Sequence, residues 1–263
     1  MKMGREKKRK WMNPCDTPFP SWPPGLWRRV IIHPGSGWIG GALEDDVHRF
    51  HMRFEHDGTR IIAARAQAIR HPWSACPGAA PHIAGELKGE LLGQVAARDP
   101  FQHCTHLYDL AVVMAAHVDD KQPTQFDLRV ADRIDERTSA ILEENGSELL
   151  RWQLDGTSIS GNGPHAGLDL KQLSRWKQEL PPRDAERATM LRRAVFVSGA
   201  RQFNPPPGLR ATDQGSQRMG VCYNYQLPQA EQSMRMDGWR SDFSSSGAPL
   251  AGFDAGAVFG ALA

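Results

Sequence analysis

An alternation of apolar and charged side chains limits most strongly what this chain can fold into. From His48 to Glu55, aromatic and thioether side chains occupy every second position, and charged or imidazole side chains lie between them. A period of two places the apolar groups on one face, which is typical of a half-buried antiparallel strand. The dipeptide Asp57-Gly58 follows and favours a tight hairpin. We therefore expect residues 59–69 to form the returning strand.

A second block along the chain has the same pattern. Residues 126–131 alternate between apolar and polar side chains, and Asn145-Gly146 is a strong hairpin dipeptide. Every second residue from Leu150 to Leu154 is apolar, and Asp155-Gly156 marks another turn. This block therefore predicts a second antiparallel meander.

The apolar spacing changes to a helical one after each block. Thr105 is the expected N-cap of the first well-defined helix, and Asp109 in its first turn complements the helix dipole. The stripe of this helix has offsets of 0, 3, 4, 7 and 11 residues and consists of Leu107, Leu110, Ala111, Met114 and Val118.

Three further segments favour helices. Residues 79–92 suit a short helix, although three glycines weaken it. A helix over residues 170–180 is expected to stop at Pro181-Pro182, and residues 184–197 form another. The predicted fold class is α+β, with antiparallel sheet meanders packed against a few helices, in two similar meander-and-helix halves. No repeat of individual residues accompanies this duplication.

The chain of 263 residues divides into three parts by composition. Residues 1–25 are basic and then rich in proline, which predicts a tail without a packed element. Residues 26–203 carry the α+β core. Residues 204–263 are rich in proline, glycine and serine, but they contain several aromatic residues. We expect this C-terminal arm to pack on the core or on a neighbouring subunit of a homo-oligomer.

Composition and charge exclude several classes of protein. The 32 basic and 30 acidic residues nearly cancel, which argues against a nucleic-acid partner. No apolar run approaches the roughly 20 residues of a membrane span, and no signal-peptide core follows the basic start. The four cysteines form no Cys-x-x-Cys pair and are expected to be reduced thiols. The prediction is a cytoplasmic protein without a cofactor or a membrane partner.

Two short motifs concentrate residues capable of chemistry: residues 71–79 (HPWSACPGA) and residues 103–111 (HCTHLYDLA). Together with residues 220–223 and 240–244, they resemble a bacterial family described as domain of unknown function 2889. The resemblance covers roughly residues 27–253, and the basic N-terminal extension departs from it. Genes of this family often lie near bacterial genes for the catabolism of aromatic or steroid-like compounds, so the resemblance implies a substrate of that class.

The second motif places Cys104 and His106 at the start of a helix, where the dipole favours a thiolate and a neutral imidazole. His103 and His106 are three residues apart, so both can ligate one metal ion if the turn is helical. The alternative metal site therefore consists of His103, His106 and Cys104, with Cys76 as a more distant ligand.

The leading hypothesis from the sequence is a cofactor-independent acid–base enzyme of the lyase or isomerase type. It would act on a small aromatic or apolar catabolic substrate. His106 or His71 would carry the proton, and Tyr108 and Asp109 would orient it. The expected substrate-binding residues are His51, Arg53, Arg70, Trp73 and Cys104.

Two alternatives remain open from the sequence. One is a metal-dependent enzyme that uses the cluster of His103, Cys104 and His106 with a divalent metal ion. The other is a non-enzymatic module that binds a small molecule or assists assembly. Under the enzyme hypotheses, we expect the two motifs to meet at the edge of a partly apolar cleft.

Overall fold

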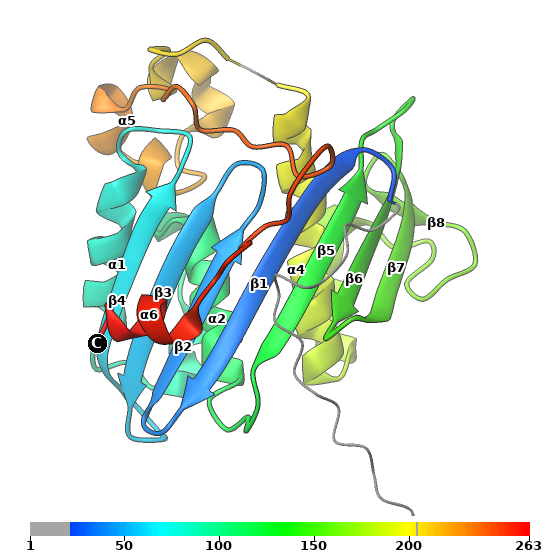
Figure 1. Cartoon of the computed structure of the whole chain (residues 1–263). Helices are drawn as coiled ribbons and strands as arrows, with labels where there is room; N and C mark the ends of the chain where they lie inside the picture. Colours follow the sequence, from blue (N-terminus) through cyan, green and yellow to red (C-terminus); the bar gives the residue numbers. More distant parts are fainter. Residues whose placement is uncertain (1–21, 204) are drawn as a thin grey trace, which may run out of the picture.

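The computed structural model describes residues 22–203 and 205–263, and its centre is one antiparallel sheet of eight strands (Figure 1). The strand order is β4-β3-β2-β1-β5-β6-β7-β8. The strands are β1 (Gly25–Gly35), β2 (Trp38–Glu44), β3 (Arg49–His56), β4 (Ile61–Arg70), β5 (Thr124–Ala131), β6 (Arg137–Glu144), β7 (Ser147–Asp155) and β8 (Ser158–Ser160).

The predicted α+β fold class is confirmed, and its two halves are visible in the order of elements. Each half is a four-stranded meander followed by helices, and the first strands of the two halves, β1 and β5, pair at the centre. The helices are α1 (Ala79–Leu87), α2 (Thr105–Ala116), α3 (Leu173–Trp176), α4 (Pro182–Ser198), α5 (Gln229–Gln232) and α6 (Ala255–Gly260).

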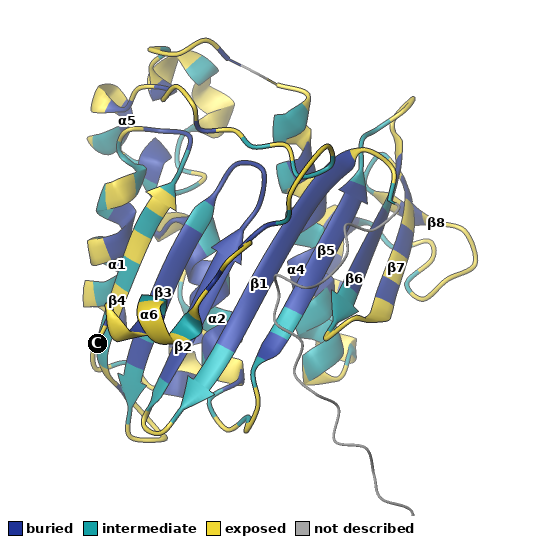
Figure 2. Ribbon diagram, in the orientation of Figure 1, coloured by how far each residue is buried: buried dark blue, intermediate teal, exposed yellow. Residues whose placement is uncertain are grey.

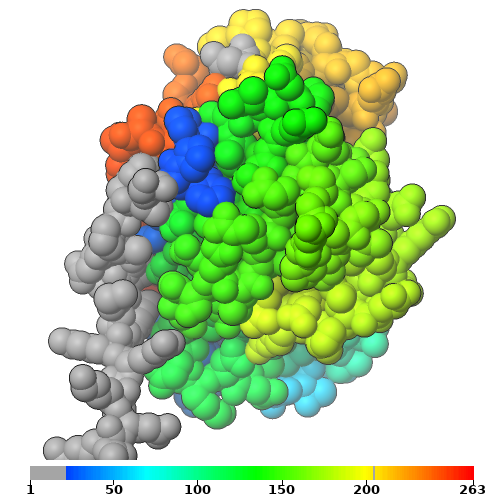
Figure 3. Space-filling model, turned by 90° about the vertical axis from the view of Figure 1, so that its right-hand side faces the viewer, coloured from blue at the N-terminus to red at the C-terminus, as the bar shows by residue number. Residues whose placement is uncertain are grey.

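The main core lies between the sheet and the helices α1, α2 and α4, which cover one face (Figures 1 and 2). Phe50, Met52 and Phe54 of β3 point into this core, as their alternation predicts. The core continues under the second half through Leu150, Trp152 and Leu154. Figure 3 views the molecule from the β8 side, where residues of the second half make up most of the surface.

The hairpin dipeptides form the turns that their sequences favour. Gly58 joins β3 to β4 with a φ of 91°, and Asn145-Gly146 joins β6 to β7 with φ angles of 51° and 77°. Several helix boundaries differ from expectation: α1 ends at Leu87, and only Leu173–Trp176 of the expected helix over residues 170–180 is α-helical. Cys104 is the N-cap of α2 in place of Thr105, without a side-chain bond. Pro182 begins α4, where its missing N–H costs nothing.

The C-terminal segment crosses the opposite face of the sheet, over the strands of the first half (Figure 1). Phe253, Phe259 and Leu262 form a second core there with Ile31 and Ala42 of the sheet. This arm therefore packs on its own chain. The expected basic, proline-rich tail lies almost entirely outside the described residues.

Two adjacent glycines of β2 allow both layers to approach the sheet closely. A Cβ added at Gly40 would lie 2.6 Å from the ring of Phe259, and one added at Gly41 would lie 2.6 Å from Sδ of Met114. Successive strand residues face opposite sides. Gly40 therefore makes room for α6, and Gly41 makes room for α2. In the described residues, no helix is long and apolar enough to span a membrane.

Candidate functional site

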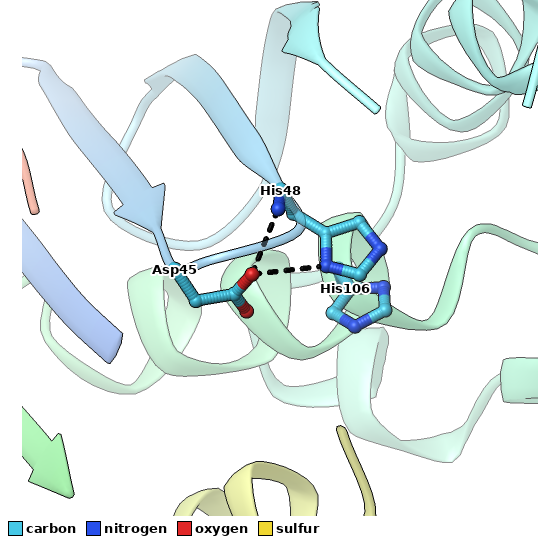
Figure 4. Close-up of side chains that lie close together, drawn as sticks. All are labelled: Asp45, His48 and His106. Atoms are coloured by element: carbon cyan, nitrogen blue, oxygen red, sulfur yellow. Dashed lines mark hydrogen bonds and ion pairs between the residues drawn. The ribbon is translucent and has the colours of Figure 1, made fainter. Parts of the chain in front are cut away.

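A buried polar cluster lies where the connection between β2 and β3 meets the start of α2. It consists of Asp45 and His48 from the connection and His106 from the first turn of α2 (Figure 4). A carboxylate oxygen and one nitrogen of each imidazole all lie within 4.8 Å of one another. The sheet and the helix layer together bring these side chains into contact.

Asp45 is fixed by several donors at once. Its Oδ1 accepts the backbone N–H groups of Val47 at 2.8 Å and of His48 at 2.7 Å. Its Oδ2 accepts the Nε of Arg28 at 2.9 Å and the Nη2 at 2.5 Å. Burial by itself raises the pKa of this carboxyl, but Arg28 and His48 outweigh it and hold the pKa well below its usual range. Asp45 is therefore an ionised, immobile acceptor.

This acceptor determines the tautomer of His48. Nδ1 of His48 lies 3.2 Å from Oδ1 of Asp45, and an ionised carboxylate can only accept a hydrogen bond. Neutral His48 must therefore carry its proton on Nδ1, which leaves the lone pair on Nε2. Burial lowers the pKa of His48 despite the opposing charge of Asp45. His48 is thus an oriented base that is neutral at pH 7.

His106 stacks on His48 with ring centroids 3.8 Å apart and planes inclined by 29°. Burial and then the neighbouring His48 lower the pKa of His106 well below its ordinary value. Its Nε2 is buried and has no hydrogen-bond partner within the described part of the chain. The ring of Phe50 adds an apolar wall, 5.6 Å from the His48 ring and 6.2 Å from the His106 ring.

A second ion pair borders this cluster from α4. Nε of Arg193 donates to Asp109 of α2 at 2.5 Å. Arg28, Asp109 and Arg193 line a cavity of about 20 Å³, enough for one water molecule, whose other walls are apolar. Arg28 on the sheet side and the Asp109–Arg193 pair on the helix side therefore face one small cavity where the two layers meet.

The residue next to Asp45 ties the C-terminal arm to the site. Asp46 is fully buried, and its carboxylate accepts a charge-assisted hydrogen bond from Arg201. The backbone of Asp46 accepts the N–H of Ser241 at 2.7 Å. Arg201 also binds Asp132 and Asp242 at 2.8 and 3.0 Å. Burial raises the pKa of Asp46 to about 6, although Arg201 opposes this shift.

Of the predicted catalytic residues, only His106 belongs to the Asp45–His48 cluster. Nδ1 of His71 lies 3.0 Å from the carbonyl oxygen of Trp73, so its ring is engaged elsewhere. The hydroxyl of Tyr108 lies 2.9 and 3.0 Å from two carbonyl oxygens of the segment that precedes α2. Asp109 is held by Arg193 and borders the cluster. It therefore supports the layer that carries His106.

The predicted substrate-binding residues are divided between two faces of the sheet. His51 and Arg53 lie on the face opposite His48, because neighbouring strand residues alternate. The His51 ring packs edge-on against Phe253, and burial lowers its pKa to about 4. Nη1 of Arg53 donates to the carbonyl oxygen of Phe259 at 2.8 Å. Both residues hold the C-terminal arm.

Arg70, by contrast, supports the connection that carries the site. Its guanidinium donates to the backbone carbonyls of Asp45 and Asp46 at 2.5 and 2.8 Å, and to Glu44 at 3.1 Å. Trp73 is buried edge-on against Tyr225, 5.7 Å away between centroids. Arg70 therefore holds the backbone of the connection between β2 and β3. Trp73 is part of a small apolar core.

The cysteines are brought together but are not activated. Burial raises the pKa of Cys104 to about 12, so the expected preference for a thiolate is wrong, because burial outweighs the helix dipole. Burial, and then Cys104 and Cys222, raise the pKa of Cys76 well above its usual value, so the two sequence motifs approach each other through their cysteines.

The alternative metal ligands do not gather into one set. Sγ of Cys104 lies 4.0 Å from Nδ1 of His106, whereas His103 lies with His82 and Tyr108. Within residues 22–203 and 205–263, the group of potential ligands that does gather is Asp45, His48 and His106.

Sequence reasoning missed Asp45, His48 and Arg28. The sequence pattern puts His48 on a strand with other histidines, and its spacing does not distinguish it from them. The signal that was available is the run Glu44-Asp45-Asp46 directly after an apolar strand, since charges at a buried strand end require partners. Comparison of the chain with protein-family models and with curated proteins finds no match.

Proposed function

We propose that this chain is an acid–base enzyme in which His48, oriented by Asp45, is the proton carrier and His106 is its partner imidazole. The observation that carries the proposal is the hydrogen-bonded pair of Asp45 and His48 under a stacked second histidine. A carboxylate that fixes one tautomer of an imidazole and stabilises its protonated form is the arrangement on which general-base catalysis by histidine depends.

The stacking makes the pair suited to moving one proton. Two imidazolium rings at 3.8 Å would repel each other, so the pair accepts one proton more readily than two. His48 takes the proton from the substrate as Asp45 stabilises the imidazolium, and a neutral His106 can accept or relay it. Phe50 beside both rings supports a small aromatic or apolar substrate, and the expected chemistry is of the lyase or isomerase type.

The resemblance to the domain of unknown function 2889 family and the expectations of aromatic catabolism, a cytoplasmic location and a homo-oligomer remain parts of this proposal. No step assigned to His48 or His106 requires a cofactor. The C-terminal arm that would embrace a neighbouring subunit packs on its own sheet, so an oligomer would use another surface or exchange the arm.

A substrate-free experiment tests the proposal first. Nitrogen-15 NMR of the histidine side chains should show neutral His48 protonated on Nδ1, with His48 titrating below pH 6.5 and His106 well below it. Asp45→Asn should remove the preference for this tautomer. Ordinary titration of both rings near pH 6.5, or a proton on Nε2 of His48, would contradict the assignment.

The kinetic experiment uses a panel of hydroxylated aryl ketones and aryl hydroxy acids in D₂O, with C–H exchange and elimination followed by NMR. We expect turnover of at least one compound and a loss of about 10²–10⁴-fold in His48→Gln and His106→Gln. His56→Gln, at the far end of β3 from the site, is the matched control. Turnover that survives in both site variants would refute the roles given to them.

A metal-dependent enzyme is the second candidate, because the three side chains also supply a carboxylate and two imidazoles within 4.8 Å. The geometry favours it less. Asp45 already accepts hydrogen bonds from four groups. The lone pairs of two stacked imidazole rings point side by side and do not converge on one metal ion. Metal analysis of the purified protein separates the candidates: one equivalent that is lost in His48→Gln would favour the metal enzyme.

A further inference from the structure

A second cluster of histidines lies in an open cleft on the other side of the start of α2. The cleft has a volume of about 350 Å³. Its lining is polar and comes from α1 and from the segment that leads into α2: His82, Glu86, Arg98, Asp99, Gln102 and His103. The mechanism proposed above uses none of these residues.

The two imidazoles of the cleft are arranged differently from the stacked pair. The ring centroids of His82 and His103 are 5.4 Å apart, and their planes are inclined by 38°. Two imidazoles that bind one tetrahedral ion at 2.0–2.1 Å have their centroids about 5 Å apart. The spacing of His82 and His103 therefore fits a shared metal ion, whereas the 3.8 Å stack of His48 and His106 does not.

His103 is buried and fixed in orientation by its neighbours, as is typical of a metal ligand. Only 3% of its surface is exposed, and its ring lies parallel to that of Tyr108 at 5.9 Å. Its carbonyl oxygen accepts the backbone N–H of Tyr223 at 2.9 Å. Its Nδ1 is buried and has no hydrogen-bond partner among the residues that the structure describes.

Glu86 supplies a third ligand of suitable position. It follows His82 by four residues on α1, so the two side chains share one helix face. Glu86 accepts a hydrogen bond from Arg98 in the structure, and it must turn away from Arg98 to reach an ion between the histidines. Arg98 would keep Glu90, to which Nη1 donates at 2.5 Å. The carboxylates outnumber the single arginine, so the cleft favours a cation.

We propose that this cleft binds a late first-row divalent metal ion, such as Zn²⁺, through His82, His103 and Glu86, with water in the remaining positions. Imidazole nitrogens and a carboxylate are the ligands that Zn²⁺ and its neighbours accept. The site is separate from the Asp45–His48–His106 cluster and does not depend on the function proposed for that cluster.

Calorimetric titration of the full-length protein with Zn²⁺ tests this proposal. We expect one equivalent to bind to the wild type and to raise its melting temperature. His82→Ala and His103→Ala should each weaken binding by about tenfold or more. His82 is only half-buried, so its variant should remain folded even if the buried His103→Ala does not. Glu86→Gln should weaken binding less than either histidine variant.

His106→Gln and His56→Ala are the matched controls, and both should bind Zn²⁺ as the wild type does. Binding that persists undiminished in His82→Ala would overturn the proposal. Loss of binding in His106→Gln with retention in His82→Ala would also overturn it, because the ion would then belong to the other cluster.

Discussion

Several buried or partly buried charges in the described residues form ion pairs. Arg28 binds Asp45, Arg193 binds Asp109, and Arg29 binds Asp127 at 2.9 Å. Removal of one partner from such a pair usually costs about 3–5 kcal/mol, because the other charge remains buried. Arg28 and Asp45 pair within the sheet layer, and Arg193 and Asp109 pair within the helix layer, so each pair stabilises one of the two layers that meet at the imidazoles.

Asp46 is also paired, but its ion pair with Arg201 does not fully compensate its burial. Its pKa is about 6 in the folded protein against 3.8 in the unfolded chain, so the folded state binds the extra proton between these values. Its contribution to stability is therefore complete below about pH 4 and is lost as the pH rises through 6. Relative to Asp46→Asn, the wild type should lose up to about 3 kcal/mol between pH 4 and pH 7.

Urea denaturation at a series of pH values measures this difference. Asp155→Asn is the control, because Asp155 is largely exposed and its substitution should give a difference independent of pH. A difference between the wild type and Asp46→Asn that does not change with pH would mean that Arg201 keeps Asp46 ionised throughout.

Phe50 links the core to the site, since it is fully buried in the main core and borders both histidines. Phe50→Ala should lower the free energy of unfolding by about 3–5 kcal/mol, the usual cost for a buried aromatic residue. Ile62→Ala, at a position that is 54% exposed, should cost less than about 0.5 kcal/mol. A cost below about 1 kcal/mol for Phe50→Ala would contradict its place in the core.

At the scale of elements, the two faces of the sheet are covered by different parts of the chain. The helices α1, α2 and α4 cover one face with a continuous core, and the C-terminal arm covers the other face over the first half alone. The connection between β2 and β3 is clamped by both layers, because Arg70 binds its backbone and Ser241 and Leu250 of the arm bind Asp46 and Glu44. The arm therefore stabilises the segment that presents Asp45 and His48.

Gly40→Ala tests how closely the arm must approach. The added Cβ would lie 2.6 Å from the Phe259 ring, so the substitution should cost about 1–3 kcal/mol of stability. In a Phe259→Ala background the same substitution should cost much less, because the ring that it meets is gone. Unfolding of the two single variants and the double variant gives the coupling. Additive effects would show that the arm moves aside freely.

On the scale of the whole molecule, the sheet forms one body from two meanders. The pairing of β1 with β5 joins the halves through eight residue pairs, and the core passes beneath it without interruption. We therefore expect a single cooperative unfolding transition for the described part of the chain.

The basic N-terminal residues are predicted to contribute nothing to this transition. Deletion of residues 1–12 removes six basic residues and no apolar periodicity, and the first strand begins only at Gly25. The melting temperature should change by no more than about 1–2 °C, since surface changes away from packed features have small effects. Differential scanning calorimetry of the two proteins measures this, and a loss of several degrees would contradict the prediction.

The sequence by itself determined the fold class and several of the elements, because these depend on short-range patterns. The alternation in β3, the turns at Asp57-Gly58 and Asn145-Gly146, and the apolar stripe of α2 each report local geometry. They sufficed for two antiparallel meanders with helices. They also placed His106 at the start of a helix, which is where it lies.

Only the tertiary structure decided which side chains meet. Asp45 and His106 are 61 residues apart, and Arg28 reaches Asp45 from a neighbouring strand. Local patterns carry no information on such pairs, since they arise when an apolar sheet face is buried under a helix layer. Burial also reversed the chemistry expected of Cys104, because the loss of water outweighs the helix dipole. The same burial keeps His48 and His106 neutral, and so makes them bases.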